Sequence, residues 1–169
     1  VREASERQVV VFTHDAVFLN CLVPASASGN IARTVRHIEW SESLPGMCRD
    51  GHPWETMKPR DRFDKLEKMQ RAIATEWNPV PNQSDREKMK FGYSSLRATL
   101  ERLVETTLLN DSINRFRGYI NIKQLEGIIG FSQTEYERIK RLFDKCSDVT
   151  EAHDPASALQ GSVPDPIEF

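Results

Sequence analysis

The triplet Thr13-His14-Asp15 contains the residue types best suited to chemistry in this sequence. It follows four apolar residues, Val9–Phe12, that do not alternate with polar ones. Such a run predicts a short strand buried on both faces, as in a parallel sheet. The working surface of an open parallel sheet is the carboxyl edge of its strands. An imidazole at that edge can donate a hydrogen bond to a phosphate or position a water. The competing interpretation is that His14 merely belongs to the cap of the following helix.

The cysteines and two of the histidines form a second set of candidate residues. The three cysteines, Cys21, Cys48 and Cys146, contain no C-x-x-C pair and are predicted to be free thiols in a reducing compartment. Cys48 with His52, and Cys146 with His153, are residue types that bind zinc. Neither spacing matches a common zinc finger or ribbon, so no metal site is predicted.

The other histidines offer weaker alternatives. His153 and Asp154 form a pair that a small nuclease or metal-dependent effector could use, although such a pair in a Pro-rich stretch is typical of a turn with a capping Asp. His37 falls in a predicted strand and His52 in a predicted loop, where structural or solvent-facing roles are expected.

Several motifs and properties are missing from the sequence. It contains no G-x-x-x-x-G-K-[ST], no G-x-G-x-x-G and no G-x-S-x-G, so the chain is not expected to hold a triphosphate by itself. No apolar run is long enough to cross a bilayer and no signal-peptide pattern is present, which predicts a cytoplasmic protein without a membrane partner. The start "VREASERQ" lacks a methionine and predicts an excised or processed segment.

Charge gives no firm indication of a nucleic-acid partner. The formal net charge is −2, which does not favour a nucleic-acid surface. The stretch "KPRDR", with Lys65 and Lys68 beyond it, gives one helix a basic start and keeps nucleic acid as a candidate partner. A solvated helix face explains these charges equally well.

The elements that must position His14 are predicted at the start of the chain. Residues 1–6 read as the last turn of a helix, and Asp15 is placed to cap a helix that Pro24 ends. "ARTVRHIEWS" predicts a second strand with one exposed face, and "SLPGMCRDGHP" predicts a loop.

The rest of the sequence predicts helices with an apolar stripe. The expected ranges are 58–77, 85–116, 121–130 and 132–147, and capping-box pairs are predicted at Ser84–Glu87 and Ser132–Glu135. The fold class is thus α+β and mostly α. Residues 1–45 form a strand-helix-strand part, residues 55–150 a helical subdomain, and residues 151–169 a Pro-rich tail.

A resemblance to a known family rests on the first of these parts. "VVVFTHDAVFL" resembles the last strand and switch-histidine segment of ABC-type ATPase heads, as in SMC-like proteins and recombination ATPases. The pieces "MKPRDRFDKL", "LLNDSINRFR" and "CSDVTEAHDPA" with "VPDP" are similar to the tails of large bacterial AAA/ABC-type ATPases related to anticodon-nuclease and defence-system proteins.

The resemblance implies a role for His14 and for partners outside this sequence. His14 would be the switch histidine that contacts the γ-phosphate of ATP, with Asp15 as its nucleotide-binding neighbour. ATP and Mg would be bound by upstream parts of the head, so the chain alone is expected to be inactive. Two heads would dimerise around ATP and act on an effector subunit, in a DNA-linked or antiviral process. The alternative is a helical interaction module with no nucleotide role.

Overall fold

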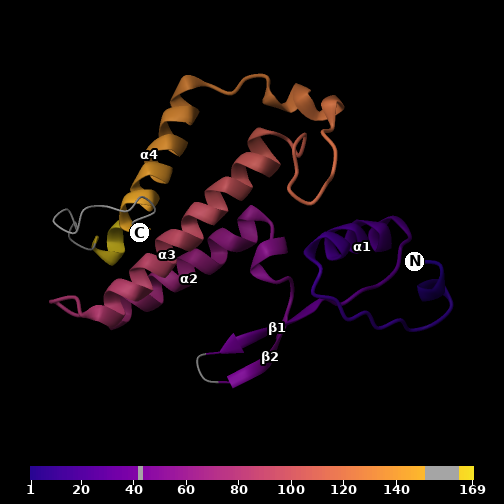
Figure 1. The fold of residues 1–169 in the computed structure, drawn as a ribbon, viewed down its shortest axis with the longest axis horizontal. Helices are drawn as coiled ribbons and strands as arrows, with labels where there is room; N and C mark the ends of the chain where they lie inside the picture. The colour runs from indigo at the N-terminus through magenta and orange to yellow at the C-terminus, as the bar shows by residue number, and fades with distance from the viewer. Residues whose placement is uncertain (42–43, 151–163) are drawn as a thin grey trace. The chain divides into compact units, whose positions relative to one another are not determined.

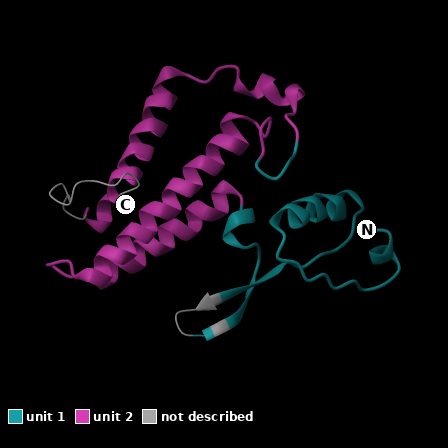
Figure 2. Ribbon diagram, viewed as in Figure 1, with its two compact units in different colours: residues 1–57, 115–118 teal, residues 58–114, 119–169 magenta. Residues whose placement is uncertain are grey.

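The computed structural model describes residues 1–41, 44–150 and 164–169. The chain forms two compact units (Figure 2). Unit 1 comprises Val1–Met57 and Arg115–Gly118, and unit 2 comprises Lys58–Asn114 and Tyr119–Phe169. The predicted fold class is confirmed, because the structure is mostly helical with a small two-stranded antiparallel sheet (Figure 1).

Unit 1 contains one α-helix and one β-hairpin. Its elements are η1 (Glu3–Ser5), α1 (Ala16–Ser28), β1 (Arg36–Ser41), β2 (Leu44–Asp50) and η2 (Trp54–Thr56). Helix α1 packs against η2. The buried residues in the described part of unit 1 are Ser26, Thr56 and Met57. Unit 1 therefore has almost no apolar core.

Helix α1 is longer than predicted. Pro24 was expected to end it, but the helix continues through Pro24 to Ser28. A proline inside a helix removes the backbone donor to the carbonyl four residues earlier, here that of Asn20. The residues after Pro24 are small and helix-compatible, and the helix ends only before Gly29.

The second half of the sheet was missed by the sequence analysis. "SLPGMCRDGHP" was predicted as loop, but Leu44–Asp50 forms β2, which pairs antiparallel with β1. Two cross-strand ion pairs stabilise the hairpin: Arg36 Nε lies 2.9 Å from Asp50 Oδ1, and Arg49 Nε lies 2.9 Å from Glu39 Oε1. The hydrogen bond from Arg49, followed by that from His37, lowers the pKa of Glu39. These pairs depend on a partner strand, which local periodicity does not reveal.

Unit 2 is a helical assembly. Its elements are α2 (Pro59–Glu76), α3 (Gln83–Leu103), η3 (Val104–Leu108), η4 (Ile122–Ile128), α4 (Gln133–Thr150) and η6 (Pro166–Glu168). Helix α3 packs against both α2 and α4 (Figure 1). The predicted capping box of α4 is confirmed, since the Ser132 backbone N–H donates to the Glu135 carboxylate and the Glu135 N–H donates to Ser132 Oγ.

The core of unit 2 follows the predicted apolar stripes only in part. Its buried members are Ile73, Met89, Tyr93, Leu100 and Cys146, with partly buried side chains packed around them. From α4, Cys146 belongs to this core, whereas Tyr136 and Leu142, two apolar side chains of the predicted helix 132–147, are exposed.

Helix α3 begins and ends differently from the prediction. The expected box Ser84–Glu87 is wrong, because Asn82 is the N-cap and Asp85 its partner. Asn82 Oδ1 accepts from the Asp85 N–H at 3.0 Å, and Asp85 Oδ2 accepts from the Asn82 N–H at 2.9 Å. The regular helix stops at Leu103 and passes into the π-helical turn η3, well before the predicted end at residue 116.

Four charged side chains in the described part of unit 2 are buried: Arg62, Asp85, Arg102 and Glu105. Arg62 Nη1 donates to the Ala98 carbonyl at 2.9 Å, so one arginine of the basic stretch faces the interior between α2 and α3. Arg102 Nη1 and Glu105 Oε2 form an ion pair at 2.9 Å where α3 meets η3. The expected basic start of α2 is weakened, since Arg62 is withdrawn from the surface.

None of the helices in the described residues is both long enough and apolar enough to cross a membrane.

Candidate functional site

The segment before α1 has no regular secondary structure and pairs with no strand among the described residues. Val9–Phe12 belongs to no strand, and its side chains are exposed, with Phe12 exposed to 89% and Val10 to 67%. Within this chain the run is therefore not a buried strand, and burial in a sheet outside this chain stays a prediction. The physical reason is the lack of a neighbour: β1 and β2 pair with each other, and no other strand is present in residues 1–41, 44–150 and 164–169.

The chain then turns into α1 through a tight network of hydrogen bonds around Asp15. The Asp15 N–H donates to Thr13 Oγ1 at 2.9 Å. Asp15 Oδ1 accepts from the N–H groups of Val17 at 2.8 Å and Phe18 at 3.2 Å. The predicted N-cap is confirmed. This network fixes the backbone on both sides of His14.

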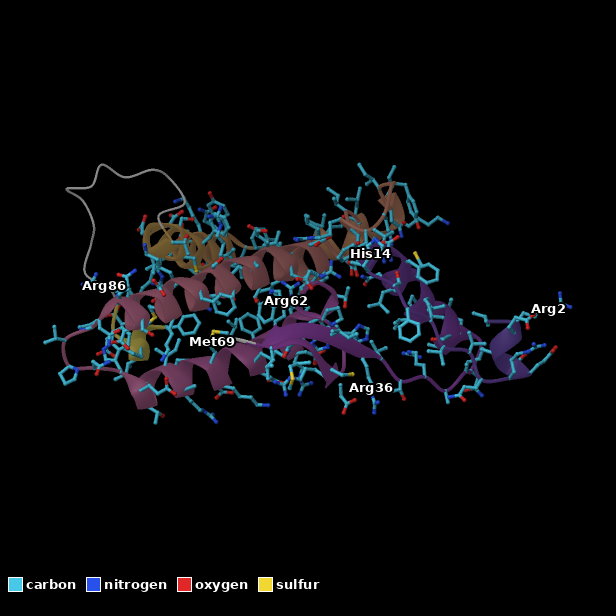
Figure 3. All side chains as sticks on the ribbon, turned by 60° about the horizontal axis from the view of Figure 1, so that its bottom comes forward. Arg2, His14, Arg36, Arg62, Met69 and Arg86 are labelled. Carbon is cyan, nitrogen blue, oxygen red and sulfur yellow. The ribbon has the colours of Figure 1, made fainter. Side chains whose placement is uncertain are left out.

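His14 is the side chain that this turn presents. It is labelled in Figure 3, is exposed, and makes no hydrogen bond or ion pair with any described residue. The Asp15 carboxylate already occupies the first N–H groups of α1, and it places a negative charge beside the imidazole. A phosphate next to His14 would therefore need cations and N–H donors from elsewhere.

The other histidines are held by their own neighbours. His37 Nδ1 lies 3.1 Å from the Gly51 carbonyl oxygen, and its Nε2 lies 3.4 Å from Glu39 Oε2. His52 Nδ1 lies 3.2 Å from Thr56 Oγ1. These contacts give both side chains structural roles within unit 1.

The candidate zinc ligands belong to two different units or lie outside the described residues. Cys48 is exposed in the hairpin of unit 1, whereas Cys146 is buried in the core of unit 2. Burial raises the pKa of the Cys146 thiol to about 11, which keeps it in the neutral form that binds metal poorly. His153 and Asp154 lie outside the described residues. Within the described ranges, no cluster of three or more His, Cys, Asp or Glu side chains is arranged to hold a metal ion.

Sequence reasoning missed a second group of contacts, which residues 164–169 make with the helices of unit 2. The last six residues contact α2, α3 and α4 through the Phe169 ring, the Glu168 carboxylate and backbone carbonyls. The only local signal was Gly92 in the middle of a helical pattern, which the structure places under the Phe169 ring.

Comparison with known proteins does not assign this chain, because no family model, no curated protein and no solved structure matches it.

Proposed function

We propose that this chain is the carboxy-terminal part of an ABC-type ATPase, to which it contributes His14 as the switch histidine. The observation that supports this most is the exposure of Val9–Phe12. Four consecutive β-branched or aromatic side chains are exposed one residue before an exposed histidine that lies next to a helix cap. Such a run has the composition of a sheet strand without its sheet.

Docking into another sheet would give the backbone of Val9–Phe12 hydrogen-bond partners and would bury its apolar side chains. An extended segment can join a sheet through main-chain hydrogen bonds, while its side chains fill the faces of that sheet. Full burial stabilises each large apolar side chain by about 1.5–3 kcal/mol, so Val9–Phe12 offers several kcal/mol for docking. In a parallel sheet the docked segment ends at the carboxyl edge, and His14 follows it.

His14 and Asp15 then have separate roles. The imidazole would donate a hydrogen bond to the γ-phosphate or hold the attacking water in line, which acts mainly in the transition state. Asp15 would hold the helix start that aims His14, beside the nucleotide. The phosphate-binding loop and the Mg ligands would come from the rest of the head, so the isolated chain should not hydrolyse ATP.

Partners follow from this role. The docked chain would lie at the interface of two ATP-bound heads, in a homo-oligomer that acts on an effector subunit. A DNA-linked or antiviral process is the setting that the family resemblance suggests. Nucleic acid has less support than a protein partner, since Arg62 is buried and acidic residues alternate with the exposed bases of α2.

The test is ATP turnover by the full ATPase that carries or recruits this segment, identified by a G-x-x-x-x-G-K-[ST] motif in the neighbouring coding sequence. His14→Ala should lower kcat by about 100-fold and change the KM for ATP much less. His52→Ala is the matched control, because His52 bonds within unit 1, and it should leave turnover unchanged. Wild-type turnover in His14→Ala would refute the switch-histidine role.

A helical interaction module is the second candidate, and one observation favours it. Apolar side chains are also exposed around η4 in unit 2: Tyr119, Ile120, Ile122, Leu125, Ile129 and Phe131. Exposed apolar residues grouped in one segment are typical of a protein-binding surface. If His14→Ala has no effect on ATP turnover while Ile122→Asp with Ile129→Asp abolishes partner binding, this second function is the better one.

A further inference from the structure

The end of the chain docks on unit 2 as a short peptide would. Residues 164–169 form a small turn, in which Asp165 Oδ1 accepts from the Ile167 N–H at 2.9 Å and Pro166 is buried. We call residues 164–169 the tail. We call the four residues that hold it the tail seat: Gln70 of α2, Gly92 and Tyr93 of α3, and Lys145 of α4.

The tail seat has a place for one aromatic ring. The Phe169 and Tyr93 rings lie with their centroids 5.2 Å apart at an interplanar angle of 49°, a tilted arrangement that is favourable for aromatic pairs. A Cβ at Gly92 would lie only 3.0 Å from Phe169 Cζ. Glycine inside a helix costs about 1 kcal/mol relative to alanine. At Gly92 this cost accompanies a close approach of the Phe169 ring, which a larger residue would obstruct.

The polar contacts hold the tail backbone and one side chain. Gln70 Nε2 donates to the Pro166 carbonyl at 3.0 Å, and Tyr93 Oη donates to the Glu168 carbonyl at 3.3 Å. Lys145 Nζ pairs with Glu168 Oε2 at 2.9 Å, a hydrogen bond that raises the pKa of Lys145. The Ile167 side chain is 85% exposed. The contacts thus select an acid at 168 and a Phe at 169 through their side chains. Position 166 is held through its carbonyl and by burial of the Pro166 side chain, and position 167 is left free.

We propose that the tail seat is a peptide-binding site for segments of the form Pro-x-Glu-Phe, and that the chain fills it with its own tail. The helices supply two side-chain donors to the tail carbonyls, a cation and an aromatic contact, which are the features of a site that recognises a short motif. This inference is independent of the ATPase proposal, since all of its residues lie in unit 2.

The test supplies the tail sequence from outside. A tethered ligand has an effective concentration in about the millimolar range, so the wild-type chain should resist a free peptide. Phe169→Ala in the 169-residue chain removes the ring and frees the site. A dye-labelled peptide with the sequence of residues 164–169 should bind this variant at least about tenfold more tightly than it binds the wild type, as measured by fluorescence anisotropy.

A charge swap makes the test specific. Lys145→Glu added to Phe169→Ala should abolish binding of the Glu-bearing peptide and restore binding of a peptide with Lys in its place. Lys140→Glu is the matched control, because Lys140 lies on the same helix and pairs with Asp144 rather than with the tail. Circular dichroism of each variant shows that the helices are intact.

Three results would overturn the inference. The first is a helical Phe169→Ala chain that binds neither peptide, and the second is a charge swap that fails to restore binding. The third is a wild-type chain whose mass doubles with concentration and returns to that of the monomer in Phe169→Ala. That result would mean that two copies exchange tails, which contradicts binding within one chain.

Discussion

The run Val9–Phe12 of unit 1 and the core cluster of unit 2 are built from similar apolar residues in opposite surroundings. Phe12 is almost fully exposed, whereas Met89 and Cys146 have no exposed surface. In unit 2, three helices provide facing stripes that cover one another. In unit 1, one short helix and a hairpin leave the run uncovered. Unit 2 completes its own core, whereas the run in unit 1 has the chemistry of a core and needs another surface.

The largest expected difference between the two regions is in the free energy of unfolding, and Met89 tests it. Met89→Ala removes a fully buried side chain between α3 and its neighbours, and such truncations cost about 2–5 kcal/mol because they lose apolar burial and leave a cavity. Phe12→Ala is the matched control and should change the free energy of unfolding by less than about 0.5 kcal/mol. Urea unfolding followed by circular dichroism measures both. Equal losses would mean that the run is buried in solution and that the two regions do not differ.

Alkaline pH should destabilise unit 2 through Cys146. Burial raises the pKa of this thiol from 9.0 to about 11, with Arg97 and Lys145 opposing the shift. The unfolded chain loses the proton at the lower pH while the native thiol keeps it, so stability falls as pH rises from about 9 to about 11. The difference corresponds to about 2–3 kcal/mol.

Unfolding free energies at about pH 8 and about pH 11 test this expectation. Cys146→Ala should make the alkaline loss smaller, although not zero, because the pKa values of Tyr93 and Lys145 are also raised. Those two groups likewise lose their contribution as pH rises. Cys21→Ala, at an exposed thiol, should leave the loss unchanged. An identical pH dependence in Cys146→Ala and wild type would contradict the assignment.

A smaller effect is expected at the start of α3. Asn82→Ala removes the side chain that accepts from the Asp85 N–H, and the loss of such a cap costs about 1 kcal/mol. Ser84→Ala is the control, since Ser84 lies inside the helix and is not its cap. Thermal unfolding of the two variants separates them. A larger loss from Ser84→Ala would restore the capping box that the sequence predicted.

The cap also shows how far sequence reasoning reaches. Local patterns located α2, α3 and α4, and they identified Asp15 and the Ser132–Glu135 pair as caps, because these features depend on residues at most one turn apart. Asn82 was missed because Asn82 and Ser84 are both cap residue types with an acid three residues later. Its partner Asp85 receives a further hydrogen bond from Asn78, the largest cause of its lowered pKa, and that contact depends on how the α2–α3 connection folds.

The features that sequence reasoning missed are nonlocal. Strand β2 has no alternating pattern and is defined by its pairing with β1. The tail seat joins Phe169 to Gly92, which are far apart in the sequence, and a glycine in a helical pattern has many explanations. At the candidate site, the sequence identified His14 and its cap Asp15, which are local features. Whether the preceding run Val9–Phe12 forms a strand depends on neighbouring strands, which local sequence does not reveal. The run Val9–Phe12 has the composition of a buried strand, and the chain offers it no partner.

The smallest effect on stability is expected in that run, where hydrogen exchange is more informative. The backbone N–H groups of Val9–Phe12 donate to no acceptor among the residues that the structure describes. In the isolated chain these amides should exchange at nearly the unprotected rate, whereas the amides of Met89–Leu100 within α3 should exchange only on opening of the helix.

Adding the ATPase head should protect Val9–Phe12 and leave Met89–Leu100 unchanged, because a docked strand gains ladder hydrogen bonds. Phe12→Asp should abolish that gain without lowering the unfolding free energy of the isolated chain. Strong protection of Val9–Phe12 in the monomer would mean that the chain completes its own sheet, and the contrast between the two regions would no longer hold.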